Sequence, residues 1–272
     1  MNKYQWIGSE KSFVDDATVI EVQPIVIGHF GGCSSAGQTK NEDGCLIFVD
    51  DKADWEFTIL LDAHNSAESA QLVVERFLME EEEIRWLMAK PLEQAFNLLE
   101  KHILSILQCK TFRESCQKVT GETAALFTVR KGKYVWWLSV GDCLLFVLHP
   151  ELKALGEVQL NQRSFYEWIG QVNTFDMPVP SYSRGIKELR QGRNHLFMTT
   201  DGLVECPNAP FENPDEIFKV FEGNSNKEAI MSLLKSIERN NVKDSTTILS
   251  WEVFLQELAT MPSNSENCGS TT

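Results

Sequence analysis

The chain has 272 residues, with 39 Asp or Glu against 25 Lys or Arg, so its formal net charge at pH 7 is -14. Hydrophobic residues make up 43% and aromatic residues 10%, which is enough to bury a sizeable core and excludes disorder as a global description. The acidic excess argues against a nucleic-acid-binding or membrane-surface protein, because both partners are anionic and would repel the chain. It does not say what the carboxylates do.

The cysteines and the first residues indicate the compartment. Seven cysteines are present, and no two are spaced as Cys-x-x-Cys, which is typical of reduced thiols rather than of a disulfide framework. The first residues lack the apolar segment of a signal peptide, and no apolar run approaches the roughly 20 residues of a membrane span. We therefore expect a soluble, cytoplasmic protein.

The first half of the body predicts a pair of strands followed by helices. Strands are expected at 44–49 and 55–61, separated by a polar turn. A helix should follow with Asn65 or Ser66 as its N-cap. A second helix should begin near Pro91, because proline is favourable in the first turn and apolar residues then recur at helical spacing.

From residue 120 the apolar runs predict mainly strands. In chain order we expect strands over 124–129, 134–140, 144–148 and 195–200, helices over 214–221 and 227–238, and a last strand over 246–254. The segment 150–193 is less regular and is either a loop packed over the core or a mobile flap. For its aromatic run, Phe165 to Phe175, packing in the core is the favoured interpretation. We expect one domain over 1–260 and a disordered tail over 261–272.

Aspartates stand beside apolar strands in several places. They occur in the segments Asn41-Glu42-Asp43, Leu61-Asp62-Ala63-His64, Thr200-Asp201-Gly202 and Lys243-Asp244-Ser245. A single aspartate of this kind is more often a turn former or an N-cap. Several converging aspartates would repel one another unless a divalent cation neutralised them. Oxygen ligands favour magnesium or manganese, and no nearby Cys/His set indicates zinc.

The order and spacing of these blocks resemble the protein phosphatase 2C family, the metal-dependent serine/threonine phosphatases. The resembling blocks are NED at 41–43, LLDAH at 60–64, GETAALFTV at 121–129, VGDC at 140–143, FMTTDGLVE at 197–205 and KDSTTILSWEV at 243–253. The resemblance implies an α+β fold, a four-layer α/β/β/α sandwich of two antiparallel sheets flanked by helices. The compact layout suggests a divergent, bacterial member.

The resemblance also implies two Mn²⁺ or Mg²⁺ ions between the sheets. Their ligands would be Asp43, Asp62, the carbonyl of Ala63, Asp201 and Asp244, with Asp62 bridging both ions. A water activated by the two ions would attack phosphoserine or phosphothreonine in a protein, without a covalent phosphoenzyme. The implied partners are a phosphorylated protein substrate and a kinase-linked signalling partner, with no nucleic acid and no membrane.

Further roles follow from the same resemblance. His64 matches the general acid that protonates the leaving oxygen, and works there with Asp62. Asp142 is implied in a third, weaker metal site with Asp201, while Glu42 and Glu205 are implied as further ligands or supporting groups.

The chain also departs from the family pattern. No arginine precedes the first motif, so Lys40 is the candidate for binding the substrate phosphate, as a point charge without a bidentate fork. Ala63 replaces a glycine, and Ser245 replaces an asparagine. These departures favour an alternative, a catalytically weak pseudophosphatase that serves as a regulatory binding module. Retention of the four aspartates and His64 favours the enzyme.

Overall fold

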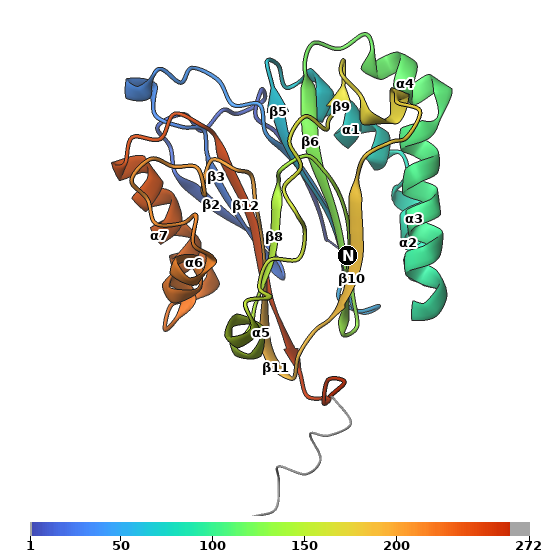
Figure 1. Ribbon diagram of the computed structural model, residues 1–272, viewed down its shortest axis with the longest axis vertical. Coiled ribbons are helices and arrows are strands. Elements are labelled where there is room, and N and C mark those ends of the chain that lie inside the picture. The colour runs from blue at the N-terminus through green and yellow to red at the C-terminus, as the bar shows by residue number, and fades with distance from the viewer. Residues whose placement is uncertain (1, 262–272) are drawn as a thin grey trace, which may run out of the picture.

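Two antiparallel β-sheets stack face to face at the centre of the computed structural model, which describes residues 2–261 (Figure 1). The seven-stranded sheet has the order β1-β4-β5-β6-β7-β10, with β9 paired to β6. Its strands are β1 Asn2–Ile7, β4 Gly44–Asp50, β5 Trp55–His64, β6 Glu122–Lys131, β7 Tyr134–Val140, β9 Ile169–Gly170 and β10 Ser183–Glu188. The five-stranded sheet has the order β2-β3-β12-β11-β8. Its strands are β2 Thr18–Val22, β3 Ile25–Phe30, β8 Leu144–Leu148, β11 Gly192–Thr199 and β12 Thr246–Leu255.

Helices cover the outer face of each sheet, which completes the predicted α/β/β/α sandwich (Figure 1). The seven-stranded sheet is covered by α1 Glu68–Leu78, α2 Glu81–Met88, α3 Leu92–Gln108 and α4 Lys110–Cys116. The five-stranded sheet is covered by α6 Pro214–Phe221 and α7 Asn226–Arg239, and the short α5 Pro150–Leu155 follows β8. Two 3₁₀ turns complete the elements, η1 Ser34–Ala36 and η2 Thr174–Asp176.

The expected elements are confirmed to within a few residues, but the start of α1 was predicted incorrectly. Its N-cap is Ala67, whose side chain cannot cap, whereas Asn65 adopts a left-handed conformation with φ 72°. Ser66 still helps, because its hydroxyl accepts a hydrogen bond from the Glu68 amide at 3.2 Å. Pro91 is the N-cap of α3 rather than its first residue.

The segment 150–193 is built differently from the expectation of core packing. It contains α5, β9, η2 and β10, and Phe175 is buried. Phe165 and Tyr166, however, are 58% and 83% exposed, so the prediction of core packing is wrong for these two rings. Most of the predicted tail, residues 262–272, lies outside the described residues.

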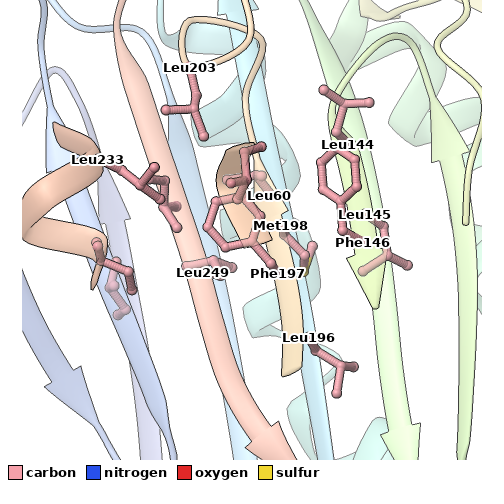
Figure 2. Close-up of a cluster of buried hydrophobic side chains, with 14 of the residues drawn as sticks. Leu60, Leu144, Leu145, Phe146, Leu196, Phe197, Met198, Leu203, Leu233 and Leu249 are labelled. Carbon is pink, nitrogen blue, oxygen red and sulfur yellow. The ribbon is translucent and has the colours of Figure 1, made fainter. Parts of the chain in front are cut away.

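The strands between the two outer layers are buried on both faces. On β11, Leu196, Phe197 and Met198 are all fully buried, although alternate side chains point to opposite sides. One face of the strand packs on the seven-stranded sheet and the opposite face packs on helices, so its apolar residues are consecutive and do not alternate with polar ones. Figure 2 shows part of this core, with side chains from β5, β8, β11, β12 and α7.

Two further observations concern the cysteines and the helices. The six cysteines in the described part of the chain are all free thiols. Within residues 2–261, no helix has both the length and the apolar character that a membrane span requires.

A buried ion pair links the two sheets at the end where β5 begins. Arg130 Nε donates to Glu56 Oε2 at 2.7 Å, and the Arg130 guanidinium also contacts Asp54. Trp251 Nε1 on β12 donates to Glu56 Oε2 at 3.2 Å, so the carboxylate joins both sheets. Both charged side chains are nearly inaccessible, at 7% and 3% exposure.

We predict that Arg130→Met lowers the free energy of unfolding by about 3 kcal/mol, because it leaves the buried Glu56 carboxylate without its cation. The double variant Arg130→Met, Glu56→Gln should recover part of this loss, since the remaining amide can still accept from Trp251. Urea denaturation measures both values. Equal losses in the single and double variants would contradict this account.

Candidate metal centre

The sandwich brings aspartates from separate parts of the chain to one end of the gap between the sheets. Asp62 is on β5, Asp142 is in the turn between β7 and β8, and Asp201 follows β11. Asp244 precedes β12, and the pairing of Thr199 with Ile248 places the end of β11 beside the start of β12. Strand ends that are far apart in the sequence therefore form one acidic edge.

Three of these aspartates form a cluster with the spacing of a metal site. Carboxylate oxygens of Asp62, Asp142 and Asp201 lie within 4.8 Å of one another, and all three residues are buried. Asp62 Oδ2, Asp142 Oδ1 and Asp201 Oδ1 have no hydrogen-bond partner among the described residues. Because a buried, unpartnered carboxylate oxygen is costly, these oxygens fit a hard divalent cation.

Asp43 lies behind this cluster and is held by three hydroxyl groups. Its Oδ1 accepts from Ser245 Oγ at 2.9 Å. Its Oδ2 accepts from Thr247 Oγ1 at 2.7 Å and from Thr200 Oγ1 at 3.3 Å. Both carboxylate oxygens are thus engaged, which favours a supporting role over the direct metal ligation that the resemblance implies. Ser245, in place of the usual asparagine, supplies one of the donors.

Burial and like charges strongly perturb the acids. Burial, reinforced by the charges of Asp201 and Asp43, raises the pKa of Asp62 well above its ordinary value. Burial raises the pKa of Asp43 to about 7 although the Thr247 hydroxyl opposes it. Burial and the Asp244 charge likewise raise the pKa of Asp201 to about 7. The protein therefore holds carboxylates where they resist ionisation unless a cation is near.

Two glycines allow the strand ends to meet. Gly141 precedes Asp142 with φ 87°, and a Cβ there would lie 2.5 Å from the Ala124 Cβ. A Cβ on Gly202 would lie 2.1 Å from the Ser245 carbonyl oxygen. Glycine after Asp201 is therefore required by the close approach of the chain segments before β12 and after β11, not by turn geometry alone.

His64 and Ala63 end strand β5 beside the cluster. The His64 side chain is exposed, and its backbone pairs with Glu122 at the end of β5, two residues beyond Asp62. Burial raises the pKa of both Asp142 and Asp244 above its ordinary value. Ala63 pairs with Thr123 as an ordinary strand residue, and the left-handed conformation comes only at Asn65. Alanine therefore replaces glycine there without backbone strain.

Lys40 and Glu42 lie together at the edge of the acidic end. Lys40 Nζ donates to Glu42 Oε1 at 2.6 Å and to the Asn65 carbonyl oxygen at 2.8 Å. Both side chains line a cleft of about 360 Å³, together with Ser9, Ser12 and neighbouring residues. The lysine charge is thus beside the segment that follows His64, but it is already paired with an acid.

The structure adds Arg163, which the sequence interpretation missed. Its Nη2 lies 3.4 Å from Asp201 Oδ2 and 3.8 Å from Asp142 Oδ2, and it also contacts Glu205 Oε1. Arg163 belongs to the irregular segment 150–193, and no periodicity or motif connects it with the aspartates. The only available signal in the sequence was a positively charged residue within 150–193, the segment interpreted as a possible flap.

The comparisons with known proteins address the fold. No protein-family model matches the chain, and no curated protein matches it. Solved structures do match. A bacterial serine phosphatase has a TM-score of 0.62 at 17% identity, with 86% of this chain and 99% of that chain covered. The serine/threonine phosphatase Stp1 from Staphylococcus aureus has a TM-score of 0.59 at 16% identity, with 88% and 94% covered.

The chain has the fold of bacterial serine/threonine phosphatases. A third similar structure is RsbX in complex with magnesium, with a TM-score of 0.55 at 15% identity and 87% and 100% of the two chains covered. The α/β/β/α phosphatase fold expected from the resemblance is therefore confirmed. At these identities the likeness concerns the fold alone.

We predict that the metal-free protein loses stability as the pH rises from about 4 to about 7. Asp43 and Asp201 have folded-state pKa values of about 7 against an ordinary value of 3.8, so folding takes up protons in this window. Stability from the protonated forms is present below the ordinary pKa and is lost as the pH rises through the folded value. Thermal unfolding in EDTA and in Mn²⁺ measures the effect.

The measurement in Mn²⁺ is the control for the measurement in EDTA. Bound Mn²⁺ stabilises the ionised carboxylates, so the unfolding temperature should depend less on pH. In Asp201→Asn, which removes one titrating group, the slope in EDTA should also be smaller. A midpoint in EDTA that rises between pH 5 and pH 7, roughly, would contradict the prediction.

Proposed function

We propose that the chain is a metal-dependent phosphatase that hydrolyses phosphoserine or phosphothreonine in proteins. The observation that carries the proposal is the buried cluster of Asp62, Asp142 and Asp201, each with an unpartnered carboxylate oxygen. This cluster lies in a fold shared with bacterial serine/threonine phosphatases and with RsbX, which was solved in complex with magnesium. Buried like charges are costly, so a chain without use for a cation gains nothing from gathering them.

The donor set fits two Mn²⁺ or Mg²⁺ ions. Asp62 and Asp201 would hold them with Asp244, and Glu42 and the carbonyl of Ala63 would complete the set. Asp43 orients these groups through Ser245, Thr247 and Thr200 rather than binding directly. When bound, the two ions lower the pKa of a water and stabilise the charge on the phosphoryl oxygens.

The remaining steps fall to side chains at the mouth of the site. His64, exposed at the end of β5 two residues beyond Asp62, would protonate the leaving serine or threonine oxygen. Lys40, held between Glu42 and the Asn65 carbonyl, would attract the substrate phosphate as a point charge. Its pairing with Glu42 weakens this attraction.

The wider setting is part of the same proposal. The substrate is a phosphorylated protein, and the reaction opposes that of a kinase in a signalling pair. Free thiols in the described chain support a reducing compartment, the cytoplasm. The net charge of -14 supports the absence of nucleic-acid and membrane partners. We further propose that residues 1–260 act as one catalytic domain.

A catalytically weak pseudophosphatase of the same fold is the second candidate. Two observations favour it: Lys40 is already paired with an acid, and Arg163 contacts two of the clustered aspartates. Such a protein would bind phosphorylated partners without turning them over. The activity test below separates the two candidates.

We predict Mn²⁺-dependent hydrolysis of a phosphothreonine peptide, abolished by EDTA and lowered at least about 100-fold in kcat/KM by Asp201→Asn. The substitution removes a charge from the cluster with almost no change in shape. Asp51→Asn, at an exposed residue of the turn before β5 and thus at the opposite end of that strand from Asp62, is the matched control and should act as the parent protein does. If the parent protein is folded but shows no turnover in saturating Mn²⁺, the enzyme proposal is contradicted and the pseudophosphatase remains as the candidate.

We predict that His64→Gln lowers kcat on a phosphothreonine peptide about 100-fold but lowers it much less on p-nitrophenyl phosphate. An alkoxide leaving group needs a proton, whereas p-nitrophenolate leaves without one. His102→Gln, on α3, is the control histidine and should change neither rate. Equal losses on both substrates would show that His64 is not the general acid.

A further inference from the structure

We propose that the Arg163 guanidinium is a built-in cation that takes the place of a third, weaker divalent ion at Asp142, Asp201 and Glu205. The chain then binds two ions, not three. The inference rests on the proposed metal centre, but it concerns the number of ions bound and does not depend on whether the site turns over a substrate.

The contacts place one positive group among three acids from different parts of the chain. Arg163 Nη2 lies 3.4 Å from Asp201 Oδ2, 3.8 Å from Asp142 Oδ2, and in contact with Glu205 Oε1. The resemblance implies an additional metal site at Asp142 and Asp201, with Glu205 as a further ligand or a supporting group. The guanidinium therefore stands where the carboxylates of that site converge.

The position of Arg163 is fixed by its neighbours on both sides. Asn161 Nδ2 donates to the Cys143 carbonyl oxygen at 2.7 Å and to Ser139 Oγ at 3.0 Å. The Asn161 side-chain oxygen accepts from the Leu145 amide at 2.8 Å. After the arginine, the Ser164 amide donates to the Gly141 carbonyl oxygen at 3.0 Å. The segment is thus bound to the same turn that carries Asp142.

The surroundings also suit a permanent charge. The Arg163 side chain is 23% exposed, and its guanidinium carbon lies 5.0 Å from the centre of the Phe165 ring. An aromatic face attracts a cation at this distance. Arginine stays protonated in proteins, so this positive charge is present whether or not metal is available.

A guanidinium and a divalent ion cannot share this position. Two cations a few Å apart repel each other strongly where water is scarce. The oxygens that face Arg163 are Asp201 Oδ2 and Asp142 Oδ2, whereas the unpartnered oxygens are Oδ1 of the same residues. The Oδ2 side of Asp142 and Asp201 is therefore occupied by arginine, whereas Asp201 Oδ1 remains available, together with Asp62 and Asp244, for the two ions.

The test counts bound ions. Equilibrium dialysis against Mn²⁺ with metal analysis should give two ions per chain for the parent protein. Arg163→Gln keeps the length of the side chain but removes its charge, and should bind a third ion or bind its weakest ion at least tenfold more tightly. Arg163→Lys keeps the charge and should bind two. Arg193→Gln, at an exposed arginine of β11, is the matched control.

A second readout follows the metal-free protein. In EDTA, Arg163→Gln should unfold at a lower temperature than the parent, because the acids lose their cation, and saturating Mn²⁺ should remove the difference. Three ions in the parent protein would overturn the proposal, whether or not the variants fold. An unchanged ion count and affinity in Arg163→Gln would also overturn it. Two ions without any turnover would support it and contradict only the proposed activity.

Discussion

The structure depends on keeping several carboxylates together in a place from which water is largely excluded. Asp43 is enclosed completely, and burial raises its pKa and that of Asp201 to about 7. An arrangement of this kind is unfavourable by itself and exists because the sandwich around it is rigid. Both sheets are covered by helices, and the strands whose ends lie beside the acids are buried on both faces, so the acids cannot move apart to relieve their repulsion.

The two ends of strand β5 solve the problem of a buried acid in opposite ways. At its beginning, Glu56 has a dedicated partner in Arg130 and a donor in Trp251, and its charge is balanced within the protein. Six residues later, about 20 Å along the strand, Asp62 has an oxygen without any partner among the described residues. The first is a closed structural contact. The Asp62 oxygen gains a partner only when a ligand binds. The presence or absence of a partner within the protein, more than acidity itself, therefore distinguishes a structural ion pair from a binding site.

The sequence predicts the centre of the sandwich well because its strands are buried on both sides. Continuous apolar runs such as 134–140 are recognisable without any knowledge of their neighbours, and they agree with β7. The N-terminal strands lack this signal. β1 lies at an edge, with its first four residues partly or fully exposed and only its last two buried, while Pro24 and Gly28 interrupt the apolar pattern of β2 and β3. These strands form because the sheets provide partners for them, and a partner is not visible in a local pattern.

The same distinction holds in the site. Aspartates at strand ends are found from the sequence because strand and acid are adjacent in it. What neutralises them is contributed from elsewhere: the hydroxyl of Thr200 reaches Asp43, which is 157 positions away, and Arg163 reaches Asp201 across 38. Such contacts depend on how the chain folds back and leave no local pattern. The balance of charge in a buried site is therefore set by the fold. It determines how much of the negative charge of the aspartates must be neutralised by metal ions.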